Sequence, residues 1–366
     1  MIKYIMSFMI ILFFTACFNK KEEDIKIGFV AGLSGKYSAL GTRIRDGFTL
    51  AFEEIDYTIN NQKIKIIQKD DKQNEIEAKK AIDFFIKNNI KLVIGNTTSS
   101  MTKVSFPLMN QQKDSLLISA TASSNYFTKK DDNFLRIQVE NSDKKFNDLK
   151  KYIYKYKNLV FIYDSKNRAY SDDYKNFFKK ELNLKWGNKF VAQFDINKPY
   201  KEIVTSLKTK DIDLIVIIAN SIDSANIIQY LKLNKIKGKI LASGWAKTMD
   251  FISNGGRAVE DVLFSTEYDE NSKDEEFLKF RKSFKEIYHK EPSIIEAQGY
   301  ELGKILIKNL LVSNDISTLK QRILSQKVYK GLQGDIVFDE YGDVTREYFM
   351  MKVKNAKYIK IEEDND

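Results

Sequence analysis

The sequence predicts an α/β fold of two lobes, each a parallel sheet flanked by helices. Short apolar runs alternate along the chain with segments whose apolar residues recur at helical spacing, the order expected of strands and their covering helices. Runs that are apolar at nearly every position, such as residues 92–94 and 213–219, suit strands buried on both faces of a parallel sheet. The alternation starts again near residue 142, and 366 residues exceed the size of one ordinary core. Two domains of typical size are therefore expected.

The first half of the chain is expected to form the first of these α/β units. Between residues 42 and 56, Ile44, Phe48 and Phe52 recur every fourth position and mark the buried face of a helix. The expected strands of this half are residues 25–30, 64–67, 92–94, 116–118 and 134–137, and further helices are expected at residues 75–87 and after residue 97.

The second half repeats the pattern and then closes with long helices and a hairpin. Its expected strands are residues 159–163, 191–194, 213–219, 239–242 and 262–266, and its expected helices are residues 142–154, 170–182, 200–207 and a segment ending at residue 233. Beyond these, helices are expected at residues 274–288, 294–312 and 317–325, and strands at 335–339, 348–354 and 358–361. Gly342 follows polar residues after the first of these last strands and predicts a tight turn there.

Small hydroxyl residues follow two successive apolar runs of the first half. In open parallel sheets, ligands lie just beyond the carboxyl ends of the strands, where helix N-termini present free N–H groups. The pattern therefore indicates an anion-binding crevice, while plain helix capping by Ser and Thr is the alternative. The hydroxyl residues are Thr97, Thr98, Ser99 and Ser100 after the first run and Ser119, Thr121, Ser123 and Ser124 after the second. In the second half, the expected strand ends offer Tyr170, Asn220 and Trp245.

Composition excludes several classes of protein. The net charge of +10 comes from Lys residues spread along the chain, without the basic block that a nucleic-acid-binding protein would show. The chain has one cysteine, Cys17, and one histidine, His289, so neither an intramolecular disulfide, a Cys/His metal cluster nor a Cys–His catalytic pair can form. Gly35-Lys36 lacks the rest of a phosphate-binding loop. We therefore expect neither an enzyme nor a cofactor, and no metal site.

The N-terminus has the layout of an export signal. Lys3 precedes an apolar run at residues 5–14, which is about half the roughly 20 residues that a membrane-spanning helix needs. Small residues then lead to Cys17, and the sequence Phe14-Thr15-Ala16-Cys17 resembles a bacterial lipoprotein box, whose cysteine is lipidated. We expect a signal peptide at residues 1–16 and a lipidated tether at residues 17–24. The alternative is a short uncleaved anchor.

Taken together, these segments resemble the type I periplasmic binding proteins, and most of all the branched-chain amino-acid (leucine/isoleucine/valine) binding proteins of ABC importers. The resemblance covers nearly everything after the signal and lies in the order and spacing of its markers. Those of the first half are Gly28, Leu33-Ser34-Gly35, Gly41, Gly47, Ala51, Ile55, Ile94-Gly95, Ser99-Ser100, Thr102, Pro107, Leu117-Ile118-Ser119 and Ser123. Those of the second half are Ser243-Gly244-Trp245, Gly255-Gly256, Ala258-Val259-Glu260, Phe338-Asp339 and Gly342-Asp343.

This family implies two lobes joined by three crossovers that close over a ligand by hinge motion. The expected first lobe is residues 25–138 and 267–346, and the second is residues 139–266 and 347–366. By the family's pattern, Ser99 and Ser123 give hydroxyls to a ligand carboxylate and Thr121 gives a backbone N–H. Leu40 packs against the ligand side chain and Tyr170 covers it. The full set expected to bind ligand is Leu40, Thr98, Ser99, Thr121, Ser123, Tyr170, Asn220 and Trp245.

One departure from the family concerns the ligand ammonium. The family's amino-acid binders place an acidic residue on a second-lobe loop, but the matching segment here reads Ser243-Gly244-Trp245-Ala246. Asp223 or Asp172 could substitute, although an acid at a helix start is also ordinary dipole chemistry. Trp245 could instead supply an aromatic wall or a cation–π contact, or simply pack between the lobes.

The resulting expectation is a monomeric, exported lipoprotein that is anchored on the extracytoplasmic side through Cys17. It would bind a small carboxylate-bearing solute, most simply an amino acid of the branched-chain type, and deliver it to an ABC permease. The alternative is a receptor that senses an amide or amino acid without transport.

Overall fold

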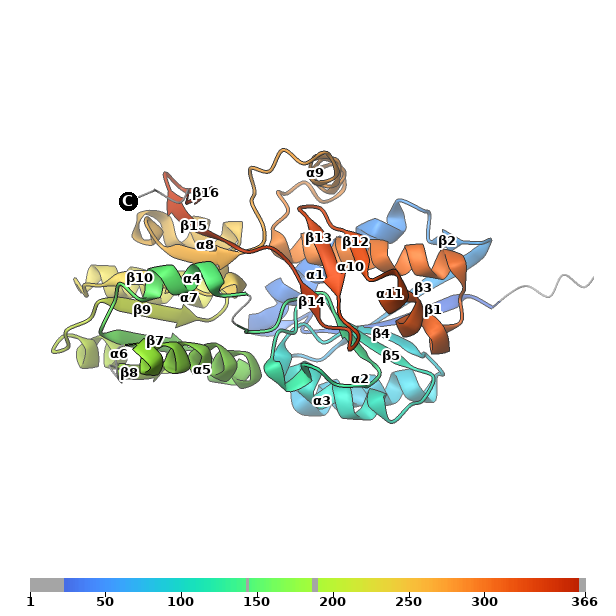
Figure 1. Cartoon of the computed structure of the whole chain (residues 1–366), viewed down its shortest axis with the longest axis horizontal. Coiled ribbons are helices and arrows are strands. Elements are labelled where there is room, and N and C mark those ends of the chain that lie inside the picture. The colour runs from blue at the N-terminus through green and yellow to red at the C-terminus, as the bar shows by residue number, and fades with distance from the viewer. Residues whose placement is uncertain (1–22, 143–144, 186–189, 362–366) are drawn as a thin grey trace, which may run out of the picture.

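The computed structural model describes residues 23–142, 145–185 and 190–361, which form two α/β lobes side by side (Figure 1). The sheet of the first lobe has the strand order β2-β3-β1-β4-β5-β6 and is parallel except at β2. Its strands are β1 (Ile25–Ala31), β2 (Thr58–Ile59), β3 (Gln62–Asp70), β4 (Leu92–Gly95), β5 (Leu116–Ser119) and β6 (Phe134–Arg136). Its helices are α1 (Ser38–Glu53), α2 (Glu75–Lys87), α3 (Ser99–Asn110), α9 (Glu275–Tyr288), α10 (Ile294–Val312) and α11 (Leu319–Gln326).

The sheet of the second lobe has the order β16-β15-β11-β10-β9-β7-β8 and is parallel from β8 to β11. Its strands are β7 (Leu159–Tyr163), β8 (Phe190–Asp195), β9 (Leu214–Ile218), β10 (Lys239–Ala242), β11 (Leu263–Thr266), β15 (Phe349–Lys354) and β16 (Lys357–Lys360). Its helices are α4 (Asn147–Ile153), α5 (Arg168–Lys185), α6 (Tyr200–Leu207), α7 (Ser221–Leu233) and α8 (Met249–Gly255). The expected fold class is therefore confirmed.

Each sheet is covered on both faces, as its uninterrupted apolar strands require. In the first lobe, one core lies under α1, α9 and α10 and the other under α2 and α3. The second lobe likewise has two separate cores. All residues of β4, β5 and β9 are buried.

Helices α1 and α10 approach each other so closely that glycine is required at their contact. A Cβ atom on Gly47 would lie 1.9 Å from the Glu296 carbonyl oxygen, and one on Gly299 would lie 2.3 Å from the Ile44 carbonyl oxygen. This backbone contact fixes the first turn of α10, including Ile295, against the first lobe.

The chain passes between the lobes three times, which we call the first, second and third crossovers. They lie between β6 and α4, between β11 and α9, and between β14 (Val344–Thr345) and β15. The last two crossovers flank a small antiparallel sheet of β12 (Val328–Lys330), β13 (Asp335–Phe338) and β14. The predicted turn at Gly342 joins β13 to β14, with φ at +102°.

The short strands β2, β12 and β14 are absent from the sequence-based expectation, and two helices also differ from it. The helix expected at residues 142–154 begins only at Asn147, because the chain before it serves as the first crossover: the Asn141 N–H donates to the Ser123 carbonyl at 3.1 Å. The short helix α8 was not expected, since it follows a polar segment without clear periodicity. Among the residues described, no helix is both long and apolar enough to cross a bilayer.

Side chains of the two lobes also bond to each other directly. The Tyr37 hydroxyl donates to Asp164 at 2.6 Å, and Lys36 pairs with Asp223 at 2.7 Å. Burial, and then the carboxylate of Asp164, raises the pKa of Tyr37. The lobes are therefore closed upon one another in this structure.

Candidate ligand-binding site

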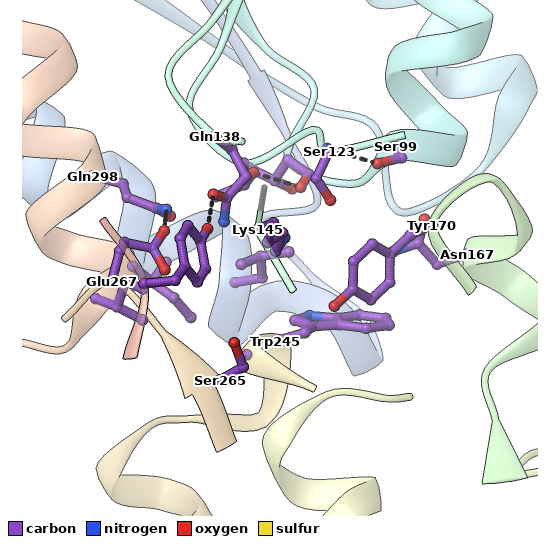
Figure 2. Close-up of a pocket in the computed structure, with 17 residues that line it drawn as sticks. Ser99, Ser123, Gln138, Lys145, Asn167, Tyr170, Trp245, Ser265, Glu267 and Gln298 are labelled. Carbon is purple, nitrogen blue, oxygen red and sulfur yellow. Dashed lines mark hydrogen bonds between the residues drawn. The ribbon is translucent and has the colours of Figure 1, made fainter. Parts of the chain in front are cut away.

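A cavity lies between the two lobes (Figure 2). Its polar lining consists of Thr97, Ser99, Thr121, Ser123, Gln138, Lys145, Asn167, Ser265, Glu267 and Gln298. Its apolar and aromatic lining consists of Leu40, Tyr170, Gly244, Trp245, Ile294, Ile295 and Tyr348. Concave sites between two lobes, with an apolar lining and a few polar groups, are typical places for small-molecule ligands.

Ser99 is the first residue of α3 and stands at the carboxyl end of β4. Its Oγ accepts the backbone N–H groups of Ser123 at 3.2 Å and Ser124 at 3.3 Å. Since these two bonds occupy both lone pairs, the hydroxyl proton is left to donate into the cavity. The Ser123 hydroxyl also lines the cavity, and both residues are buried. Two hydroxyl donors thus converge at neighbouring strand ends, as the sequence predicts.

Thr121 contributes differently from these two serines. Its hydroxyl donates to the Thr97 carbonyl at 2.6 Å, so its proton is already used in a hydrogen bond within the first lobe. Its N–H makes only a long bond, 3.4 Å, to the Ser119 hydroxyl. Thr121 can therefore present an N–H group to the cavity.

The second lobe closes the cavity with aromatic rings. Tyr170, near the start of α5, meets Trp245 edge to face at 6.0 Å between ring centroids. Trp245 stacks on Tyr37 of the first lobe at 6.2 Å. Burial raises the pKa of Tyr170, so the phenol stays neutral and acts as a hydrogen-bonding wall. Trp245 therefore both lines the cavity and packs between the lobes.

Polar side chains from the crossovers and α10 complete the lining. The Glu267 carboxylate, directly after β11, accepts a hydrogen bond from the Gln298 amide at 3.0 Å. The Tyr348 hydroxyl, on the third crossover, donates to Gln138 Oε1 at 3.0 Å. Figure 2 shows Glu267 and Gln138 both reaching into the cavity. Glu267 is 7% exposed, so a carboxylate is held almost dry beside the ligand space.

Lys145 is a buried cation on the first crossover. Its Nζ has two long contacts, to Asn141 Oδ1 at 3.3 Å and to the Val139 carbonyl at 3.5 Å. Burial lowers the pKa of Lys145 to about 8, while the carboxylate of Glu267 opposes that change. The side chain is thus mostly in its charged ammonium form at neutral pH, and it lines the cavity.

Six of the eight ligand-binding residues expected from the sequence line this cavity: Leu40, Ser99, Thr121, Ser123, Tyr170 and Trp245. The other two do not. The Thr98 hydroxyl accepts the Met101 N–H as the cap of α3 and donates to Gln73, and Asn220 caps α7. Cys17 lies outside the described residues.

The acids weighed for a ligand ammonium also lie elsewhere. Asp223 pairs with Lys36, and Asp172 pairs with Arg168 and Lys175. Glu267 is the carboxylate that lines the cavity in the described part of the chain. The one signal that could have found it is its position directly after the apolar run at residues 262–266.

No group of three or more Cys, His, Asp or Glu side chains with metal-binding geometry is present in the described part of the chain. Neutral hydrogen-bonding groups and two opposite charges dominate the cavity instead. Such a lining can hold a small polar solute by complementary bonds.

Two lobes that close over a buried polar cavity are the general architecture of a solute-binding protein. The model of the periplasmic binding protein family matches residues 24–357, and this chain belongs to that family. No curated protein is significantly similar to it.

Solved structures of similar fold come from several bacteria. A leucine-binding protein from Thermotoga maritima is 23% identical with a TM-score of 0.83, covering 92% of this chain and 98% of its own. A branched-chain amino acid transporter substrate-binding protein from Streptococcus pneumoniae, in complex with isoleucine, is 20% identical with a TM-score of 0.81 over 93% and 100% of the two chains. An ABC transporter solute-binding protein from R. palustris, in complex with benzoate, is 15% identical with a TM-score of 0.82 over 92% and 95%. These likenesses agree on the fold, while their ligands differ.

Proposed function

We propose that this chain is the extracytoplasmic substrate-binding lipoprotein of an ABC transporter and that it binds an amino acid between its lobes. The observation that carries the proposal is the pairing of two opposed features in one cavity. Ser99 and Ser123 offer hydroxyl protons at one place, and the buried carboxylate of Glu267 stands at another. A free amino acid carries the matching pair of charges.

The carboxylate of the ligand would bind at Ser99 and Ser123. A carboxylate accepts several hydrogen bonds, and bonds to a charged acceptor are about twice as strong as neutral ones. The two amide N–H groups that bond to the Ser99 Oγ polarise its hydroxyl and make it a better donor. The Thr121 N–H adds a third donor on the same side.

The ammonium of the ligand would bind at Glu267. Gln298 already holds one of its oxygens, which fixes the carboxylate in place before a ligand arrives. A simple carboxylic acid such as benzoate has no cation to offer to this carboxylate, so it would make no bond of opposite charges at Glu267.

The family and the neighbouring structures support a transport role. The family's members are periplasmic binding proteins, and the solved neighbours include substrate-binding proteins of ABC transporters. We place the protein outside the cytoplasm, anchored through a lipid on Cys17, from where it would act as a monomer and deliver its solute to a permease. The sequence at residues 14–17 supports the anchor.

The direct test is to identify the solute that the protein carries. Full-length protein from its native host would be purified without added solute, denatured, and the released small molecules identified by mass spectrometry. Release of an amino acid, and calorimetric binding of that amino acid at one site per chain, is the expected result. Recovery of a solute without an amino group, together with no heat from any of the twenty amino acids, would contradict the proposal.

A further inference from the structure

The first crossover presents a second set of hydrogen-bond donors to the cavity, distinct from Ser99 and Ser123. Gln138 Oε1 accepts two bonds, from the Tyr348 hydroxyl at 3.0 Å and from the Val139 N–H at 2.9 Å. Because a backbone N–H can only donate, this pair fixes which end of the amide carries the oxygen. Among the described residues, none accepts a hydrogen bond from Gln138 Nε2, and Figure 2 shows this nitrogen turned into the cavity.

Lys145 adds a positive charge to the same segment. It is 6% exposed, and its two contacts with oxygen atoms, at 3.3 and 3.5 Å, leave at least one of its three N–H donors without an acceptor in the described part of the chain. A buried ammonium with such weak partners is costly unless an anion neutralises it. The carboxylate of Glu267 attracts it, yet the two groups do not form an ion pair.

The cavity therefore has two subsites for anions and one for a cation. The hydroxyls of Ser99 and Ser123 form the first anion subsite, and the amide of Gln138 with the ammonium of Lys145 forms the second. Glu267 is the only carboxylate that lines the cavity in the described chain. A branched-chain amino acid fills one anion subsite and the cation subsite, but leaves Lys145 facing an aliphatic side chain.

We propose, resting on the proposed function, that the ligand is an acidic α-amino acid whose side-chain carboxylate binds to Lys145 and Gln138. Two carboxylates and one ammonium in the ligand then meet two anion subsites and one cation subsite in the protein. Lys145 is thus the residue that determines specificity within the class of amino acids.

The test compares ligands that differ only in the second charge. Titration calorimetry on the full-length protein would measure L-glutamate, L-aspartate, L-glutamine and L-leucine at pH 7. We expect L-glutamate or L-aspartate to bind at least about tenfold more tightly than L-glutamine and L-leucine, because a charge-assisted bond exceeds a neutral one by about that factor. Lys145→Met should remove this preference while leaving the affinity for L-glutamine nearly unchanged.

Lys175→Met is the matched control, because Lys175 is equally buried but pairs with Asp172 outside the cavity. It should leave the preference intact. If Lys145→Met fails to fold in a thermal scan, Lys145→Gln provides the same test with a polar side chain.

Each contrary outcome has a separate meaning. Tightest binding of L-leucine or L-glutamine would overturn the acidic class while leaving the proposed function in place. Equal losses for L-glutamate and L-glutamine in Lys145→Met would show that Lys145 holds the α-carboxylate, which also overturns it. Absence of binding by all four amino acids and by any other would overturn the proposed function itself.

Discussion

Replacing Ser99 by alanine is the sharpest test of the carboxylate subsite. The hydroxyl of Ser99 can make two kinds of hydrogen bond: its oxygen accepts the N–H groups of Ser123 and Ser124, and its proton can be donated to a ligand. Ser99→Ala removes both. The first loss acts on the folded protein with or without ligand, and the second acts only on the complex.

The loss of ligand affinity and the loss of stability in Ser99→Ala can be measured separately. A hydrogen bond to a charged group contributes about 1.5–3 kcal/mol, so the dissociation constant for the cognate solute should rise by about tenfold to about a hundredfold. The two N–H groups lose their acceptor, and an unsatisfied buried group costs about 1–3 kcal/mol, which should lower the unfolding midpoint without ligand. Calorimetry measures the first effect and a thermal scan the second.

Thr98→Ala is the matched control for this variant. Thr98 is the neighbouring residue and caps the same helix, but it lies outside the cavity. Loss of its cap should cost about 1 kcal/mol of stability and leave ligand affinity unchanged. An unchanged dissociation constant in Ser99→Ala, or an equal loss of affinity in Thr98→Ala, would refute the assignment of Ser99.

Four other perturbations test separate features. Burial lowers the pKa of Lys145 to about 8, so the side chain loses its charge as pH rises from 7 to 9 and the calorimetric affinity for L-glutamate should fall. Over the same range, the stability of the ligand-free protein should rise, because the unfolded chain holds the Lys145 proton more tightly than the folded chain does. Tyr37→Phe removes the 2.6 Å bond to Asp164 and should increase the radius of gyration of the ligand-free protein in X-ray scattering. Gly47→Ala places a Cβ 1.9 Å from a carbonyl oxygen of α10 and should cost about 1–3 kcal/mol of stability by chemical denaturation. Cys17→Ser should shift the protein from the membrane to the soluble fraction and abolish palmitate labelling; retention at the membrane would contradict the anchor.

The fold could be predicted from the sequence because the signals for helices and strands are local. The spacing of apolar residues along an element depends only on which of its faces are buried. Strands β4, β5 and β9 are buried on both faces, and their sequences are apolar at nearly every position. The sequence also predicts that Ser99 and Ser123 lie close together, because residues that follow successive parallel strands lie at one edge of the sheet. The position of a residue on such an edge follows from strand order alone.

The cavity-lining residues of the crossovers could not be predicted from local patterns. Lys145 stands in a charged run that is typical of a solvated surface, and Glu267 opens the polar stretch Glu267-Tyr268-Asp269-Glu270. The direction of their side chains depends on how the two lobes pack, which no local pattern encodes. Asn220 does follow a buried strand, as its position in the sequence indicates, but it does not line this cavity: its amide donates to Asp223 at 2.6 Å and its oxygen caps the start of α7.

The position of the charged groups links ligand binding to the movement of the lobes. Lys145 and Gln138 lie on the first crossover, Glu267 begins the second, and Tyr348 lies on the third. In a hinged protein, these few segments absorb the change in backbone angles when the lobes open. A ligand that bonds to them together with Ser99 ties the crossovers to the first lobe, and Tyr170 and Trp245 can cover it only when the second lobe is near. Since a ligand shifts a conformational equilibrium only by its differential affinity for the two states, contacts that exist together only in the closed form are the ones that close the protein.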